Sequence, residues 1–188
     1  MDQRLKFFID NVQRHYFCDF PIYSAGPDEY VGVFMKHHLA SRFSELQAGQ
    51  ALALPYCSTP TGEEIAWERL QGLCRASESA VVLDRFIRSI HLLNYLSQPE
   101  RWQRVFLPVS MALIAGVEKG HGKVFGDILD RLECPRQRIG MLLPSQLLLD
   151  AERTRIVAQA YQHHGFATAS LDSAGLSREI LPAPSSDA

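Results

Sequence analysis

The 188-residue sequence lacks most of the features that assign a chain to a specialised class. It has no long apolar run, and Asp10, Asn11 and Gln13 interrupt the hydrophobic residues near the N-terminus. We therefore expect neither a secretory signal peptide nor a membrane-spanning helix, and a cytoplasmic location. Only four cysteines occur, none of them in a CxxC pair, so we predict reduced, mostly buried thiols rather than a disulfide framework.

An excess of positive charge is missing as well. Charged residues make up 21% of the chain and the formal net charge is −2, whereas a surface that binds phosphates usually carries a basic excess. No nucleic-acid partner is predicted. The hydrophobic fraction of 46% is typical of a folded globular protein, and the length suits one domain or one domain with an appendage.

Common catalytic and metal-binding motifs are absent. No GxSxG or HExxH occurs, and no histidine has zinc spacing to a cysteine. The seven histidines are therefore expected at the surface or at helix ends: His15, His37, His38, His91, His121, His163 and His164. The glycine-rich stretch 116–123 lacks GxxxxGK[ST] spacing and is interpreted as a loop, with an anion-binding turn as the alternative. The pair Asp84 and Arg88 is interpreted as an ordinary i,i+4 ion pair that contributes only a few tenths of a kcal/mol to stability.

Hydrophobic periodicity predicts alternating helices and strands. Helices are expected over residues 2–17, 63–76, 80–96, 121–132 and 147–163, and strands over 51–57, 105–110, 138–143 and 166–171. Residues 20–28 are predicted to be a loop, and residues 30–35 either a strand or the start of a helix. In the last helix, the side chains expected to face inward are Leu148, Ile156, Val157, Ala160 and Tyr161.

The last three strands are spaced by about 30 residues, which is the length of a βα unit. Such a series predicts an α/β fold with a parallel sheet and right-handed crossovers. We expect an N-terminal helix and loop over residues 1–28, an α/β domain over 29–175, and a flexible tail over 176–188.

One family resemblance extends over residues 36–175. The segment VVLDRFIRSIHLLNYL (81–96) resembles the helix before the third strand of EAL domains, the cyclic di-GMP phosphodiesterase family. RVFLPVSMALIAGV (104–117), HGKVFGDILDRLECPRQRIGMLLPSQLL (121–148) and YQHHGFATASLDSAG (161–175) are similar to the family's next segments in order and spacing. KHHLASRFSEL (36–46) and ALALPYC (51–57) stand where its first strand and EAL strand stand. The family has a TIM-like barrel, which implies here a partial TIM-barrel-like fold with an extra N-terminal helix and a shortened C-terminal side.

The family's metal-ligand positions carry mostly other residues in this sequence. The EAL strand offers Leu54, Pro55 and Tyr56, the Asn position of the next strand reads Pro108, the Glu position of the fourth reads Leu142, and the aspartate pair reads Leu171-Asp172. The divalent metals of the family prefer oxygen ligands, and leucine and proline side chains offer none. The resemblance therefore implies no metal, no catalytic residue and no cofactor, and it leaves a cofactor-binding site undefined.

We interpret the sequence as a non-catalytic, EAL-like regulatory or scaffolding protein of bacterial signal transduction that acts through protein–protein contacts. Alternatives left open are a cyclic di-GMP receptor, a residual phosphodiesterase, and an unrelated α/β binding module. The strand at 166–171 has no predicted successor, so its outer edge is expected to be free. That edge predicts self-association, a second protein, or pairing with residues 30–46; membrane insertion is not expected.

Overall fold

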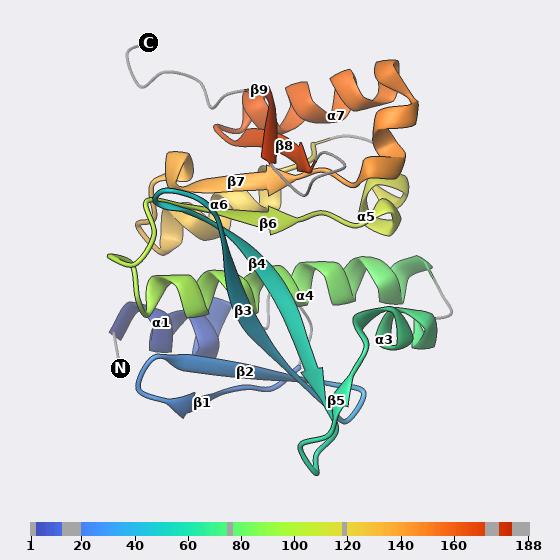
Figure 1. The fold of residues 1–188 in the computed structure, drawn as a ribbon. Coiled ribbons are helices and arrows are strands. Elements are labelled where there is room, and N and C mark those ends of the chain that lie inside the picture. The colour runs from blue at the N-terminus through green and yellow to red at the C-terminus, as the bar shows by residue number, and fades with distance from the viewer. Residues whose placement is uncertain (1–2, 13–19, 75–76, 118–119, 172–176, 182–188) are drawn as a thin grey trace. The chain divides into compact units, whose positions relative to one another are not determined.

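The computed structural model describes residues 3–12, 20–74, 77–117, 120–171 and 177–181, and the chain forms two compact units (Figure 1). Unit 1 consists of Met1–Ser44 and Ala53–Arg101, and unit 2 of Glu45–Leu52 and Trp102–Ala188. Strands β3 (His37–Gln47) and β4 (Gln50–Ser58) contribute residues to both units. Within the described part of the chain, no helix has both the length and the apolar character needed to cross a membrane.

Unit 1 is built on an antiparallel meander. Strand β1 (Ile22–Gly26) pairs with β2 (Glu29–Phe34), β2 pairs with β3, and β5 (Glu64–Ile65) pairs with β4. The β2–β3 turn consists of Met35 and Lys36, whose φ values of 48° and 68° give the mirror-image turn that matches strand twist. The helical segments are α1 (Gln3–Phe7), the π-helical η1 (Phe8–Val12), α3 (Trp67–Leu73) and α4 (Ser77–Leu96).

Helix α4 packs directly on β2 because Gly32 has no side chain. A Cβ atom at Gly32 would contact Ile90 Cδ1 and would lie 2.7 Å from Phe86 Cζ. The rings of Phe20, Phe34 and Phe86 meet at the same place, with centroids 4.8 to 6.5 Å apart. The apolar residues at helical spacing on this helix are buried: Leu83, Phe86, Ile87, Ile90 and Leu93.

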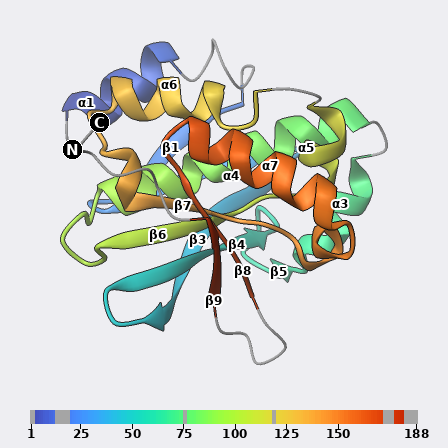
Figure 2. The same ribbon diagram turned by 90° about the horizontal axis from the view of Figure 1, so that it is seen from above.

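Unit 2 contains the parallel sheet that the βα spacing predicts. The first residues of β4 pair with β6 (Arg104–Pro108), β6 with β7 (Ile139–Leu142), and β7 with β8 (Ala167–Leu171), all in parallel. Helices α5 (Met111–Gly116), α6 (Lys123–Arg131) and α7 (Ala151–His163) connect these strands, with short 3-10 turns η2 (Arg136–Arg138) and η3 (Ser145–Leu149). Figure 2 shows α6 and α7 on the same side of the strands. The predicted α/β fold is confirmed.

The outer edge of β8 was predicted to be free, and this prediction is wrong. Strand β9 (Ser177–Leu181) pairs with it in antiparallel orientation, so residues predicted to be part of a flexible tail cover the N–H and C=O groups of β8 instead. This arrangement is none of the three outcomes expected from the sequence. The sequence gives little local signal for this five-residue strand, because its polar segment is stabilised mainly by the strand with which it pairs.

Other local predictions also need correction. Residues 20–28 contain β1 rather than only a loop, and the helix predicted from residue 63 begins at Trp67, after β5. Residues 30–35 form a strand and not the start of a helix, and α5 was not predicted.

Residues 13–17, 75–76 and Asp172 lie outside the described residues. Leu148 and Ile156, which the periodicity predicts to face inward, are exposed. Gly165 follows the end of α7 with φ +87°, the left-handed conformation in which glycine commonly ends a helix.

Candidate functional site

One face of the sheet of unit 2 carries apolar side chains. Leu52, Phe106, Leu142 and Ala169 form a buried cluster, and Leu46 and Leu171 pack against it. The strand register explains the cluster, because Leu52 pairs with Phe106 and Leu142 pairs with Ala169 in adjacent parallel strands. Paired residues of parallel strands point to the same side of a sheet.

The ring of Phe106 covers the backbone of its neighbour Gly140 on this face. The two residues are register partners in β6 and β7. A Cβ atom at Gly140 would contact Phe106 Cδ1 and Cε1, and would lie 3.1 Å from Phe106 Cζ. Glycine is therefore required at residue 140 for the ring to lie flat on the sheet. The result is a close-packed apolar surface on the strand face that carries Leu52, Phe106, Leu142 and Ala169.

The structure brings together the predicted ligand positions of unit 2. Pro108 and Leu142 are register partners at the carboxyl ends of β6 and β7, and Leu171 is the last residue of β8. Leu54, Pro55 and Tyr56 lie in the part of β4 that belongs to unit 1. In parallel α/β sheets the carboxyl ends of the strands form the usual site of function. Here these positions carry a proline and two leucines, which supply no oxygen ligand.

Among the described residues, no group of three or more His, Cys, Asp or Glu side chains could hold a metal ion. Tyr56 contributes instead to a polar contact in unit 1. The guanidinium of Arg42 lies 4.0 Å from the Tyr56 ring centroid and donates to both carboxylate oxygens of Glu64 at 3.1 Å. The side chains of Arg42 and Glu64 are exposed, and their opposite charges neutralise each other.

Helix α4 carries buried polar residues that the sequence did not identify as buried. Arg88 Nε donates to Asp84 Oδ2 at 2.8 Å, and both side chains are only 5–6% exposed. The predicted i,i+4 ion pair is therefore confirmed, but it is buried, so the small contribution expected of a surface pair does not apply to it. His91 is fully buried, contrary to the surface role predicted for the histidines, and its Nδ1 lies 2.8 Å from Ser41 Oγ. Burial, and then the nearby Arg88 cation, lowers the pKa of His91 to about 3.

A side-chain amide continues this polar network to the sheet of unit 1. Asn94 Nδ2 donates to Ser41 Oγ at 3.1 Å and to the carbonyl of Tyr30 at 2.9 Å, and Asn94 Oδ1 accepts from Tyr30 N–H at 2.6 Å. The network consists of short polar groups from α4, β2 and β3. Its hydrogen bonds hold these elements together, and we assign it a structural role.

An arginine links the ends of two helices in unit 2. Arg136 donates from Nε and Nη2 to the two carboxylate oxygens of Asp130, at 3.1 and 2.5 Å, and from Nη1 to the carbonyl of His164 at 2.8 Å. Asp130 is in the last turn of α6, and His164 caps α7. Burial, followed by the charges of His163 and Arg136, lowers the pKa of His164. Arg136 thus has a structural function, because it joins Asp130 near the end of α6 to the carbonyl that follows α7.

Comparison with known proteins gives a match in structure and none in sequence. No family model matches the sequence, and no curated protein matches it. Among solved structures, the fold is similar to one described as the crystal structure of the FimX EAL domain, with a TM-score of 0.51 and 13% sequence identity. The match covers 89% of this chain and 60% of that chain, so this chain spans about three fifths of its length. This likeness shows that the fold is EAL-domain-like.

Proposed function

We propose that the chain is a degenerate EAL-like domain without catalysis, which acts in cyclic di-GMP signalling as a regulatory or scaffolding protein through protein–protein contacts. One observation carries the proposal. The carboxyl ends of β6, β7 and β8 meet as in an EAL-like sheet, and they present Pro108, Leu142 and Leu171 where the resembled family presents oxygen ligands.

Metal-assisted hydrolysis needs these ligands for a physical reason. A divalent cation lowers the pKa of a bound water only if oxygen donors hold the ion after it leaves bulk water. A face of Leu52, Phe106, Leu142 and Ala169 offers only van der Waals contacts, which do not offset the loss of hydration. The packed ring of Phe106 on Gly140 supports the same proposal, because its carbon atoms cover the strand face on which this apolar cluster lies.

Titration calorimetry tests the proposal on the complete chain. The chain is titrated first with Mn²⁺ or Mg²⁺, and then with cyclic di-GMP in the presence of each metal. We expect no saturable heat from either metal alone, because the strand ends lack oxygen ligands. Saturable metal binding that is lost in Asp172→Ala would contradict the proposal and favour a residual phosphodiesterase.

The nucleotide titration separates the non-catalytic alternatives. Binding of cyclic di-GMP without metal binding would favour a receptor over a protein-binding scaffold. Absence of both heats supports the scaffold.

A further inference from the structure

Strand β9 covers the last edge of the parallel sheet of unit 2. It pairs with β8 in antiparallel orientation, whereas β4, β6, β7 and β8 pair with one another in parallel. The register of the β8–β9 pair shifts between Thr168 and Ala169, and β9 ends the strand order (Figure 1). Among the described strands, β9 is therefore attached to the sheet through β8 alone.

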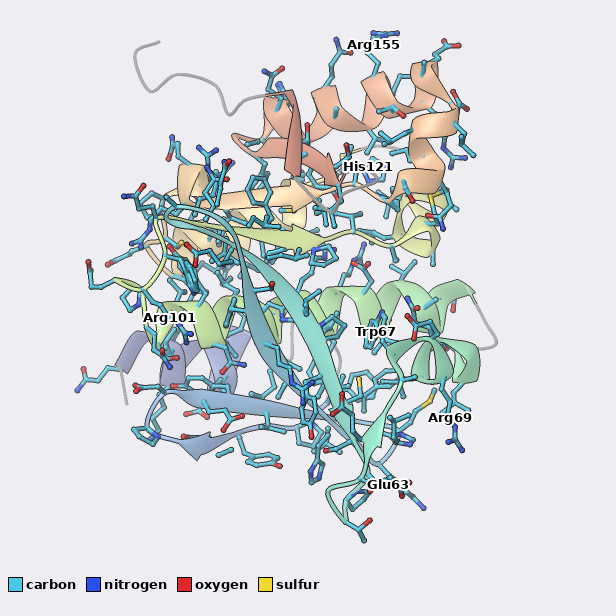
Figure 3. All side chains as sticks on the ribbon, in the orientation of Figure 1. Glu63, Trp67, Arg69, Arg101, His121 and Arg155 are labelled. Atoms are coloured by element: carbon cyan, nitrogen blue, oxygen red, sulfur yellow. The ribbon has the colours of Figure 1, made fainter. Side chains whose placement is uncertain are left out.

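The two faces of β8 are covered by other parts of unit 2. On one face α7 packs against β8 and buries Val157 and Tyr161, while Arg155 points away from the strands (Figure 3). On the other face Ala169 belongs to the apolar cluster with Leu52, Phe106 and Leu142. What β9 covers is the lateral edge of β8, which consists of backbone N–H and C=O groups.

A hydrogen bond on the opposite edge of β8 shows which of these groups face β9. The carbonyl of Ala169 accepts from Leu143 N–H at 2.8 Å, so the backbone groups of Ala169 point towards β7. Successive residues of a strand direct these groups to opposite edges, which places the groups of Ser170 on the β9 side. Ser170 is the register partner of Arg178. The N–H of Arg178 therefore points towards β8, and the N–H of the next residue, Glu179, points away from it.

The sequence of β8 has none of the features that protect an edge strand. Residues 167–171 read Ala-Thr-Ala-Ser-Leu, with no charge and no proline. Uncovered backbone groups on such a strand are a template for pairing with a strand of another chain. The sequence of β9, in contrast, contains two charged residues, Arg178 and Glu179. Charged residues are a common protection of the strand that ends a sheet.

We propose that β9 is an autoinhibitory edge cap, which occupies the edge of β8 and thereby prevents this edge from pairing with that of a second copy of the chain. An antiparallel pair of identical strands has two-fold symmetry, so the same uncovered edge serves both copies. The parallel pairs β4–β6, β6–β7 and β7–β8 do not involve β9, so the parallel sheet stays folded when the cap is released. This inference goes beyond the proposed function, because it holds whether or not the chain binds a metal or a nucleotide.

Two adjacent proline substitutions in the full chain test the cap. Arg178→Pro removes the N–H that faces β8, whereas Glu179→Pro removes an N–H that faces outward, where an edge strand tolerates proline. In sedimentation velocity over a concentration series, we expect Arg178→Pro to self-associate at least about tenfold more tightly than wild type. Glu179→Pro is the matched control and should sediment as wild type does.

Hydrogen exchange at low protein concentration shows what the substitution does to the edge itself. In Arg178→Pro, the amide of Ser170 should exchange at least about tenfold faster than in wild type, because it loses its partner strand. The amide of Leu143, which donates to Ala169, should keep its protection, because β7 and β8 stay paired. The same comparison in Glu179→Pro should show no change at either amide.

Several results would overturn the inference. Self-association of Arg178→Pro that equals that of wild type or of Glu179→Pro would show that β9 does not prevent pairing. Unchanged exchange at Ser170 would show that Arg178 does not hold this edge. Loss of protection at both Ser170 and Leu143 would show that β9 is required for the fold rather than as a cap. None of these results affects the metal titration, so the proposed lack of catalysis fails or stands separately.

Discussion

The side chain of Asn94 bonds both backbone polar groups of Tyr30, with its Oδ1 accepting from the N–H at 2.6 Å and its Nδ2 donating to the C=O at 2.9 Å. The register of β2 with β3 runs over Gly32, Val33 and Phe34 and does not include Tyr30. The amide of Asn94 thus replaces ladder hydrogen bonds at the point where β2 leaves β3. Buried backbone groups need such partners, so α4 and the meander of unit 1 depend on this contact.

Replacement of Asn94 should therefore destabilise the fold. Asn94→Ala leaves a buried N–H and a buried C=O without their partner, and we expect a loss of about 2–4 kcal/mol in the free energy of unfolding. Gln98→Ala, an exposed amide two residues beyond α4, is the control and should change stability by less than about 0.5 kcal/mol. Urea denaturation measures both. Equal, small effects would show that Asn94 does not hold α4 to β2.

Alanine substitution at two glycines, Gly32 and Gly72, should change stability in opposite directions. Gly32→Ala places a methyl group against Ile90 and Phe86, and we expect it to destabilise by about 1–3 kcal/mol. Gly72→Ala, in α3, meets no atom within 4 Å and should stabilise by up to about 1 kcal/mol through helix propensity. Thermal melting compares the two variants. A Gly32→Ala protein as stable as wild type would mean that α4 does not approach β2 as closely as the structure shows.

The buried His91 predicts a dependence of stability on pH. Its pKa is lowered from 6.5 to about 3 in the folded chain, so the unfolded chain binds the proton first as the pH falls. This contribution is fully present above pH 6.5 and is lost as the pH falls towards 3, with a slope of at most about 1.4 kcal/mol per pH unit.

Urea denaturation at several pH values measures this slope. His91→Leu removes the group and should flatten the curve between pH 6.5 and 3, although carboxylates still contribute to acid unfolding. Arg88 is the cation that adds to the effect of burial on His91. An identical slope in wild type and His91→Leu would show that His91 titrates normally and is not buried in solution.

The longest features of the fold were predictable from sequence because the core determines their periodicity. Helix α4 and the three parallel strands β6, β7 and β8 each carry an apolar face or run that local pattern reveals. Strands β1, β5 and β9 are not predicted because none of them carries a continuous apolar run, and each depends on a neighbouring strand. The six-residue α5 has only a Ser110 cap, whose side chain accepts from Leu113 N–H, as a local signal.

Burial of polar side chains was the part that the sequence did not reveal. Asp84 and Arg88 have the same i,i+4 spacing whether the helix face is exposed or enclosed, and only packing around α4 distinguishes the two. The opposite error occurred at Ile156, which is apolar and exposed. The register partners Pro108 and Leu142 were brought together as predicted, because their distances from the starts of β6 and β7 follow from the strand boundaries.

The most direct test of the central claim is hydrolysis of cyclic di-GMP by the complete chain in Mg²⁺ or Mn²⁺, followed by chromatography of the products. An active EAL phosphodiesterase serves as the positive control. We expect no metal-dependent turnover above the rate without protein, because Pro108, Leu142 and Leu171 supply no oxygen ligands at the strand ends. Turnover that requires the metal and disappears in Asp172→Ala would contradict it.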